Sequence, residues 1–400
     1  MSKVNRALVL GDIGLQYAVE PSPTAPLLVV ALPTEDEDGP RAVEYLRDTD
    51  MVTDRVWVRT RDGHPPRSLD LDEALPVWDG FALHPRFTEL LTARGLLGED
   101  HDLSSMSPLL VLRTHEQAGG PGQNEVLACT RLRTLGVLFA QVASFADEKE
   151  STDRTGDRAR RGLNEVRRLH DHTGTDFQLY TTFESGTEIE MKFTLKDAVS
   201  PWGLAATLAS RVGTDDFPGF IPDVGNEHQR WETRQETYEV LWPAPEVGYI
   251  AFIANASGSY LLKRKRFAKD GLRREETFRT EIEVPDGDFD AFLSKEYPEL
   301  GFRRLPSLTR AKFDVNVESS RTGHFFGIEI DEVRVAERDA VLRQVELEYH
   351  RTRVHADMNP QLIEEELERL ANLVEQFLSA RGVPTERTFY SKLSFLRDIT

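Results

Sequence analysis

The sequence contains a single cysteine, Cys129, among its 400 residues. An intrachain disulfide and a zinc site built from several thiolates are therefore excluded. Long apolar runs are also missing, since no stretch of about 18 apolar residues occurs that could span a bilayer. The first residues, MSKVNRALVLGDIGLQ, lack the apolar core and cleavage site of a secretory signal peptide. We expect a cytoplasmic protein that makes no contact with membranes.

Positive charge is scarce as well, because 49 Lys and Arg residues face 68 Asp and Glu residues, for a net charge of −19. Proteins that wrap DNA gain affinity by neutralising phosphates, so DNA wrapping is not expected. A hydrophobic content of 39% is sufficient for packed cores. One stretch, 263–279, is rich in lysine and arginine. A basic cluster within an acidic chain indicates a specific anionic ligand.

The length predicts two or three domains. In residues 1–147, short apolar runs alternate with turns, which predicts an α+β module with strands at 25–32, 55–58 and 108–112 and helices at 87–93 and 133–146. Residues 148–180 are highly charged and predict a linker followed by a short solvated helix. The role of the amino-terminal module stays open between binding a protein partner, covering a site in the second domain and a second enzymatic activity.

From residue 181 to residue 400 the pattern changes to strict alternation of charged and apolar residues. In Glu188-Ile189-Glu190-Met191-Lys192, the three charged side chains share one face of a strand. One such face is typical of a solvated edge strand, but here the pattern recurs in successive strands. The other pairs and triplets are Lys263 and Lys265; Arg279, Glu281 and Glu283; Arg310 and Lys312; Glu329 and Asp331; and Glu346 and Glu348.

A closed antiparallel barrel accounts for these repeated charged faces, because closure removes the edges and gives every strand an inward side. Two carboxylates about 4 Å apart repel by about 4 kcal/mol at an effective dielectric constant near ~20, and a divalent cation with oxygen ligands relieves this. Inward lysines and arginines would bind a polyanion. The second domain is therefore predicted to be a barrel with a water-filled, charged interior that binds a metal-bridged polyphosphate. Helices flank it at 201–212 and 364–380.

The motif Glu188-x-Glu190-x-Lys192 resembles the ExExK signature of the CYTH superfamily, the triphosphate tunnel metalloenzymes. Later segments resemble that family in the same order over about 181–400: RQETY at 234–238, GSYLLKRK at 258–265, IEIDEV at 328–333, VELE at 345–348 and RTFYSKLSF at 387–395. The chain differs from the usual pattern in its Lys263-x-Lys265 pair, where arginine is common.

The resemblance implies a triphosphate tunnel that uses Mg²⁺ or Mn²⁺. The implied catalytic residues are Glu188, Glu190 and Lys192. The implied ligands of the triphosphate are Lys192, Lys263, Lys265, Arg310 and Lys312. The implied metal ligands are Glu188, Glu190, Asp331, Glu346 and Glu348, with Glu329 as an alternative or additional partner of Asp331.

Three functions remain open at this point. The first is metal-dependent hydrolysis of an inorganic or nucleoside triphosphate. The second is a class IV-type adenylate cyclase that makes cyclic AMP and pyrophosphate. The third is a non-catalytic module that binds a nucleotide or polyphosphate. Hydrolysis demands the simpler geometry, since it needs only a water beside the terminal phosphorus.

Overall fold

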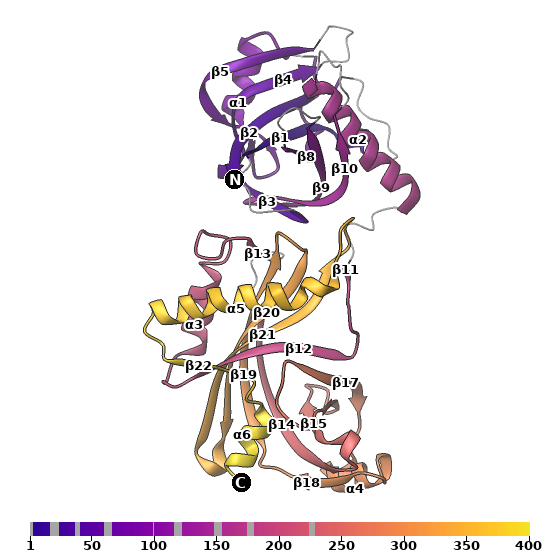
Figure 1. The fold of residues 1–400 in the computed structure, drawn as a ribbon, viewed down its shortest axis with the longest axis vertical. Helices are drawn as coiled ribbons and strands as arrows, with labels where there is room; N and C mark the ends of the chain where they lie inside the picture. The colour runs from indigo at the N-terminus through magenta and orange to yellow at the C-terminus, as the bar shows by residue number, and fades with distance from the viewer. Residues whose placement is uncertain are drawn as a thin grey trace. The chain divides into compact units, whose positions relative to one another are not determined.

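The computed structural model describes residues 3–16, 24–36, 41–59, 66–98, 100–115, 122–147, 154–173, 180–223 and 229–400 (Figure 1). The chain forms two compact units. The first comprises Met1–Thr181 with the short segments Ser320–Gly323 and Thr352–Met358, and the second comprises the rest. None of the described helices is both long and apolar enough to cross a membrane.

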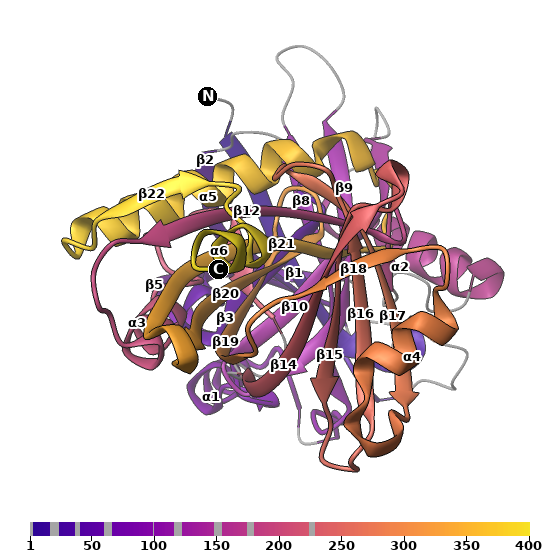
Figure 2. The ribbon, with the colours of Figure 1, turned by 90° about the horizontal axis from the view of Figure 1, so that it is seen from below.

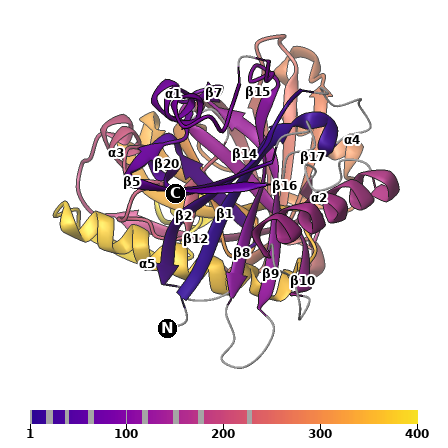
Figure 3. The same ribbon diagram turned by 90° about the horizontal axis from the view of Figure 1, so that it is seen from above.

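The first unit is built on one antiparallel sheet with the strand order β3-β10-β9-β8-β1-β2-β4-β5 (Figure 1). Figure 3 shows β5, β2, β1, β8, β9 and β10 from above. Its strands are β1 (Lys3–Asp12), β2 (Leu27–Asp36), β3 (Val43–Arg47), β4 (Val52–Arg59), β5 (Arg67–Pro76), β8 (Met106–His115), β9 (Gln123–Arg133) and β10 (Gly136–Ala146). A small hairpin, β6 (Trp78–Asp79) and β7 (Ala82–Leu83), precedes α1 (Pro85–Ala93), and α2 (Arg154–Thr173) follows β10.

Both faces of this sheet are covered by apolar side chains. Phe87 and Leu91 of α1 pack on one face, and α2 packs on the other. The sequence predicted a solvated helix within 148–180, but Ala159 and Val166 of α2 are fully buried in the core. The apolar side of α2 packs on the sheet, so the helix is part of the first unit's fold.

The predicted helix at 133–146 is wrong, because residues 136–146 form strand β10 between β9 and β3. Val137 and Phe139 face the core on the α1 side, while Phe145 faces the core under α2. A strand buried on both faces has no period of two in its hydrophobicity, so its sequence resembles that of a buried helix.

The second unit contains a closed antiparallel barrel, which confirms the predicted α+β fold class. The ring runs β12-β17-β16-β15-β14-β19-β20-β21, and pairing of β21 with β12 closes it (Figure 2). Its strands are β12 (Thr187–Leu195), β14 (Gln229–Trp242), β15 (Gly248–Ala254), β16 (Tyr260–Arg266), β17 (Arg273–Ile282), β19 (Leu308–Ser319), β20 (His324–Val335) and β21 (Ala340–Arg353).

Short strands and helices complete the described residues of this unit. Strand β13 (Phe220–Pro222) pairs with β19, β18 (Gly301–Arg304) with β14 and β22 (Thr385–Thr388) with β12. In the first unit, β11 (Tyr180–Thr181) pairs with Thr352 and Arg353 at the end of β21. The helices are α3 (Pro201–Ala209), α4 (Phe289–Glu296), α5 (Ile363–Ala380) and α6 (Lys392–Asp398).

The main hydrophobic core of the barrel lies on its outside. Ile189 and Phe193 of β12 point outward and pack with Leu204 of α3 and Leu367 and Leu370 of α5. A second outer core joins β14, β15 and β16 to α4. The outward residues thus supply the burial that stabilises the fold, and the residues between them are left to face the interior.

We propose that the second unit folds independently of the first. Expressed alone, residues 182–400 should form a soluble protein that melts at a lower temperature than the full chain. The ring and its outer cores lie inside this unit, but Ser320–Gly323 and Thr352–Met358 group with the first unit and would lose partners, including the Tyr180 hydroxyl bonded to Arg353 at 3.0 Å. Circular-dichroism melting of both proteins checks this, and an insoluble fragment would contradict it.

Candidate functional site

Charged side chains of opposite sign face each other across the inward side of the barrel. Lys192 lies opposite Glu346, Lys312 opposite Asp331, Lys265 opposite Glu276, and Glu188 opposite Arg274. Directly opposed residues of an antiparallel pair share one face, and opposite charges stabilise such pairs. The strand register therefore forms these four pairs of opposite charge, while it also sets Glu190 opposite Glu348 and Asp314 opposite Glu329.

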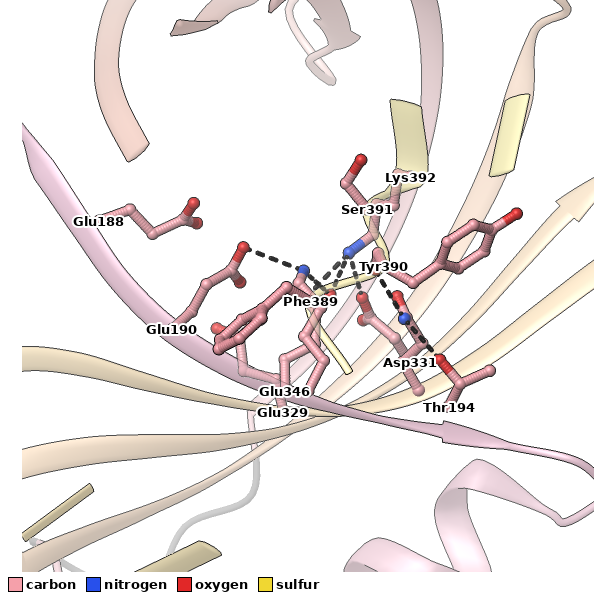
Figure 4. A network of polar contacts seen from close by, with 12 residues as sticks. Glu188, Glu190, Thr194, Glu329, Asp331, Glu346, Phe389, Tyr390, Ser391 and Lys392 are labelled. Carbon is pink, nitrogen blue, oxygen red and sulfur yellow. Dashed lines mark hydrogen bonds and ion pairs between the residues drawn. The ribbon is translucent and has the colours of Figure 1, made fainter. Parts of the chain in front are cut away.

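Glu346 of β21 lies where three cations converge, and Figure 4 shows one of them, Lys392, beside it. Arg310 donates to it at 3.2 Å, Lys392 of α6 at 2.8 Å, and the ammonium of Lys192 also bonds its carboxylate. Burial alone would raise the pKa of Glu346, but the ammonium groups of Lys192 and Lys392 and the Arg310 guanidinium lower that pKa well below its usual value. Glu346 is therefore ionised and is a centre of negative charge.

A first acidic group consists of Glu329, Asp331 and Glu346, whose carboxylate oxygens lie within 4.8 Å of one another. Arg310 donates to Asp331 at 2.9 Å, and Lys312 donates to Glu329 at 2.7 Å. Although burial favours its neutral form, Lys312 and Arg310 lower the pKa of Glu329 to about 2. Closely spaced ionised oxygens are the ligands that hard divalent cations prefer, so this group fits Mg²⁺ or Mn²⁺.

A second acidic group consists of Glu188, Glu276 and Glu348, again with oxygens within 4.8 Å of one another. Lys265 contacts Glu276 at 3.4 Å and also bonds Glu188. Burial and the nearby carboxylate of Glu190 raise the pKa of Glu188, while burial and the carboxylate of Glu329 raise that of Glu348. These closely spaced carboxylates repel one another, and a divalent cation would relieve that repulsion.

Glu190, the central glutamate of the ExExK motif, lies outside both acidic groups. It is 1% exposed, bonds the Arg274 guanidinium and lies 3.0 Å from the Lys192 ammonium. Burial favours its neutral form, but Lys192 and Lys265 lower its pKa far below the ordinary range. In this arrangement Glu190 orients cations, whereas the resemblance implies that it binds metal.

The ten residues that the resemblance implies as catalytic, triphosphate-binding or metal-binding all lie on inward faces of the barrel, and Lys263 among them pairs with Glu276 at 2.5 Å. Glu188 and Glu348 fall in one acidic group and Asp331 and Glu346 in the other, with Glu329 beside Asp331. Sequence reasoning did not assign three further interior residues to the site: Arg274, Glu276 and Lys392. The alternation of Arg274 and Glu276 could have indicated their shared face.

The prediction that Arg279, Glu281 and Glu283 face the barrel interior is wrong, because all three residues are exposed to solvent. Arg279 lies opposite Leu262, which packs in the outer core, and its guanidinium pairs with Glu296 of α4 at 3.2 Å. Arg274 and Glu276 of β17 face the interior, whereas Ile282, beyond the register shift, packs in the outer core. The register of β17 against β16 shifts between Tyr260 and Leu262, and the alternation of residues alone does not reveal such an irregularity.

Helix α6 covers one end of the barrel interior. Beyond the charged side chains, the inward faces carry Leu308, Val333 and Leu342, which pack against Leu393 and Leu396 of α6. At the start of α6, Lys392 reaches the charged zone and lies 2.8 Å from Asp331 (Figure 4). The charged side chains contact one another directly.

No protein-family model matches this chain, and no curated protein matches it. Similar solved structures include HpAC1 from Hippeastrum, reported with a dominant triphosphatase activity, at 15% identity and a TM-score of 0.32, covering 53% of this chain and 95% of that one. The PH1819 protein of Pyrococcus horikoshii OT3 gives 18% identity and a TM-score of 0.32, covering 53% of this chain and 98% of that one. The RNA triphosphatase Pct1 of S. pombe, in complex with the Spt5 CTD, gives 11% identity and a TM-score of 0.23, covering 54% of this chain and 84% of that one. At scores and identities this low, the functions of those proteins do not transfer to this chain.

Proposed function

We propose that the second unit is a CYTH-type enzyme that hydrolyses a triphosphate inside its barrel with the help of Mg²⁺ or Mn²⁺. The observation that carries the proposal is the arrangement of lysines, arginines and carboxylates on the inward faces of one closed ring. A purely structural barrel would fill its interior with apolar side chains, because buried charges cost free energy even when they are paired.

The balance of charge in the interior supports a role for metal. The basic side chains, from Lys192, Lys263, Lys265, Arg274, Arg310, Lys312 and Lys392, are almost equal in number to the acidic ones around them. A triphosphate carries several negative charges, so its entry would leave a large excess of negative charge. One or two bound divalent cations would supply the missing positive charge and polarise the phosphoryl oxygens.

The residues of the chain divide into two kinds under this proposal. Glu329, Asp331 and Glu346 would hold a metal, and the group around Glu188 and Glu348 could hold a second. The lysines and arginines that now bond these carboxylates would turn to the phosphate oxygens. Lys192, Lys263, Lys265, Arg310 and Lys312 would orient the triphosphate and stabilise charge on its terminal phosphoryl group.

Hydrolysis is preferred to cyclisation, because cyclisation also requires a ribose hydroxyl held against the α-phosphorus. We expect ATP incubated with the protein and Mg²⁺ or Mn²⁺ to yield ADP and orthophosphate. Separation of the products by chromatography checks this. Equal amounts of cyclic AMP and pyrophosphate would instead establish the cyclase, and metal-dependent binding of ATP without any product would establish the non-catalytic module.

A further inference from the structure

The barrel end away from α6 contains a cavity of about 340 Å³. Its lining comes from the first residues of β14 and β20 and the last residues of β19 and β21. Lys312 and Glu329 of the charged interior form part of the same lining. A group bound in this cavity would therefore be continuous with a phosphate chain bound by the interior cations.

Trp231 presents an aromatic surface to this cavity. Its side chain is 51% exposed, yet the ring is held in place because its Nε1–H donates to Asp314 Oδ2 at 3.1 Å. Asp314 is in turn bonded by the Lys312 ammonium at 3.2 Å. An indole that is fixed at one edge and open on its surface is suited to stacking a flat ring.

Of the other described side chains that line the cavity, Arg351 already has partners, whereas two side-chain amides could bind a ligand. The Arg351 guanidinium lies 4.7 Å from the centre of the buried Phe325 ring and pairs with Asp223 at 3.2 Å. Within the described part of the chain, the side-chain amides of Asn316 and Gln229 have no hydrogen-bond partner, although both line the cavity. Each amide offers donors and an acceptor, which match the polar edge of a heterocycle.

We propose that this cavity binds the aromatic base of a nucleoside triphosphate, an inference that rests on the proposed triphosphate site. The base stacks on Trp231, and the amides of Asn316 and Gln229 are available to its edge. The net charge of −19 disfavours a long nucleic acid, so the ligand is a free mononucleotide. Inorganic tripolyphosphate has no group that could fill the cavity, so the cavity favours the nucleoside triphosphate over it.

The test compares Trp231→Leu with Trp202→Leu in the full chain. Trp202 is a matched control, because it is also 51% exposed but contacts Phe313 in a tilted arrangement, with ring centres 5.6 Å apart, outside the cavity. We measure kcat/KM for ATP and for tripolyphosphate with Mg²⁺. Trp231→Leu should lower the ratio of the two values about tenfold, and Trp202→Leu should leave it unchanged. An unchanged ratio in Trp231→Leu would overturn the subsite.

Calorimetric binding of ATP in Mg²⁺ separates this inference from the proposed function. Binding that weakens about tenfold in Trp231→Leu without phosphate release in the wild type would support the subsite and contradict hydrolysis. Phosphate release from ATP and tripolyphosphate with the same ratio in both proteins would support hydrolysis and contradict the subsite. Failure of the wild type to bind ATP would contradict the subsite directly.

Discussion

Replacing Glu346 by glutamine should reduce phosphate release from a triphosphate at least about a hundredfold. Among the residues that the structure describes, Glu346 is the one carboxylate that Lys192, Arg310 and Lys392 all contact, and it belongs to the acidic group with Glu329 and Asp331. The neutral amide removes a proposed metal ligand and leaves three cations around a neutral group. Steady-state kinetics at several Mg²⁺ concentrations measure the loss.

Glu332→Gln is the matched control for that substitution. Glu332 follows Asp331 on β20, but it points out of the barrel and pairs with Arg343 at 2.7 Å. We expect Glu332→Gln to retain wild-type turnover. Thermal melting of both variants shows whether they are folded. A folded Glu346→Gln protein with full activity would remove Glu346 from the proposed site.

Removing divalent metal should abolish turnover, and adding Mg²⁺ or Mn²⁺ back should restore it. The two acidic groups would otherwise repel the phosphate oxygens that the interior cations attract. Phosphate release in excess chelator, before and after the metal is returned, measures the effect. Undiminished turnover in chelator would contradict the metal assignment.

Metal binding can also be followed without substrate. At about a hundred times its dissociation constant, a cation that binds only the folded chain should raise the free energy of unfolding by about 2.7 kcal/mol. Glu346→Gln should lose much of that increase, while Glu332→Gln should keep it. Denaturant unfolding with and without Mg²⁺ measures both.

The barrel was predictable because its alternation is strict and its charges are unusual. Glu188, Glu190 and Lys192 could share a face only on a strand, and the recurrence of such faces required an interior. The covering helices were visible as well, since the apolar stripe of α5 includes Leu367, Leu370 and Val374. Local periodicity was sufficient for these features.

Other parts depended on contacts that no local pattern contains. Lys392 belongs to a short helix, and its ammonium reaches Asp331 only because α6 packs within the end of the ring. The inward face of β17 depends on a register shift against β16. Strand β10 resembles a helix in sequence because both of its faces are buried.

Because the barrel's main hydrophobic core lies on its outer side, the residues of a strand that stabilise the fold are not the residues that face the interior. In β12, Ile189 and Phe193 pack beneath α5, while Glu188, Glu190 and Lys192, which alternate with the outward residues, point to the interior. Selection for folding and selection for chemistry therefore act on alternate residues. A lineage built on this architecture can exchange inward side chains and acquire new ligands while keeping the same hydrophobic shell.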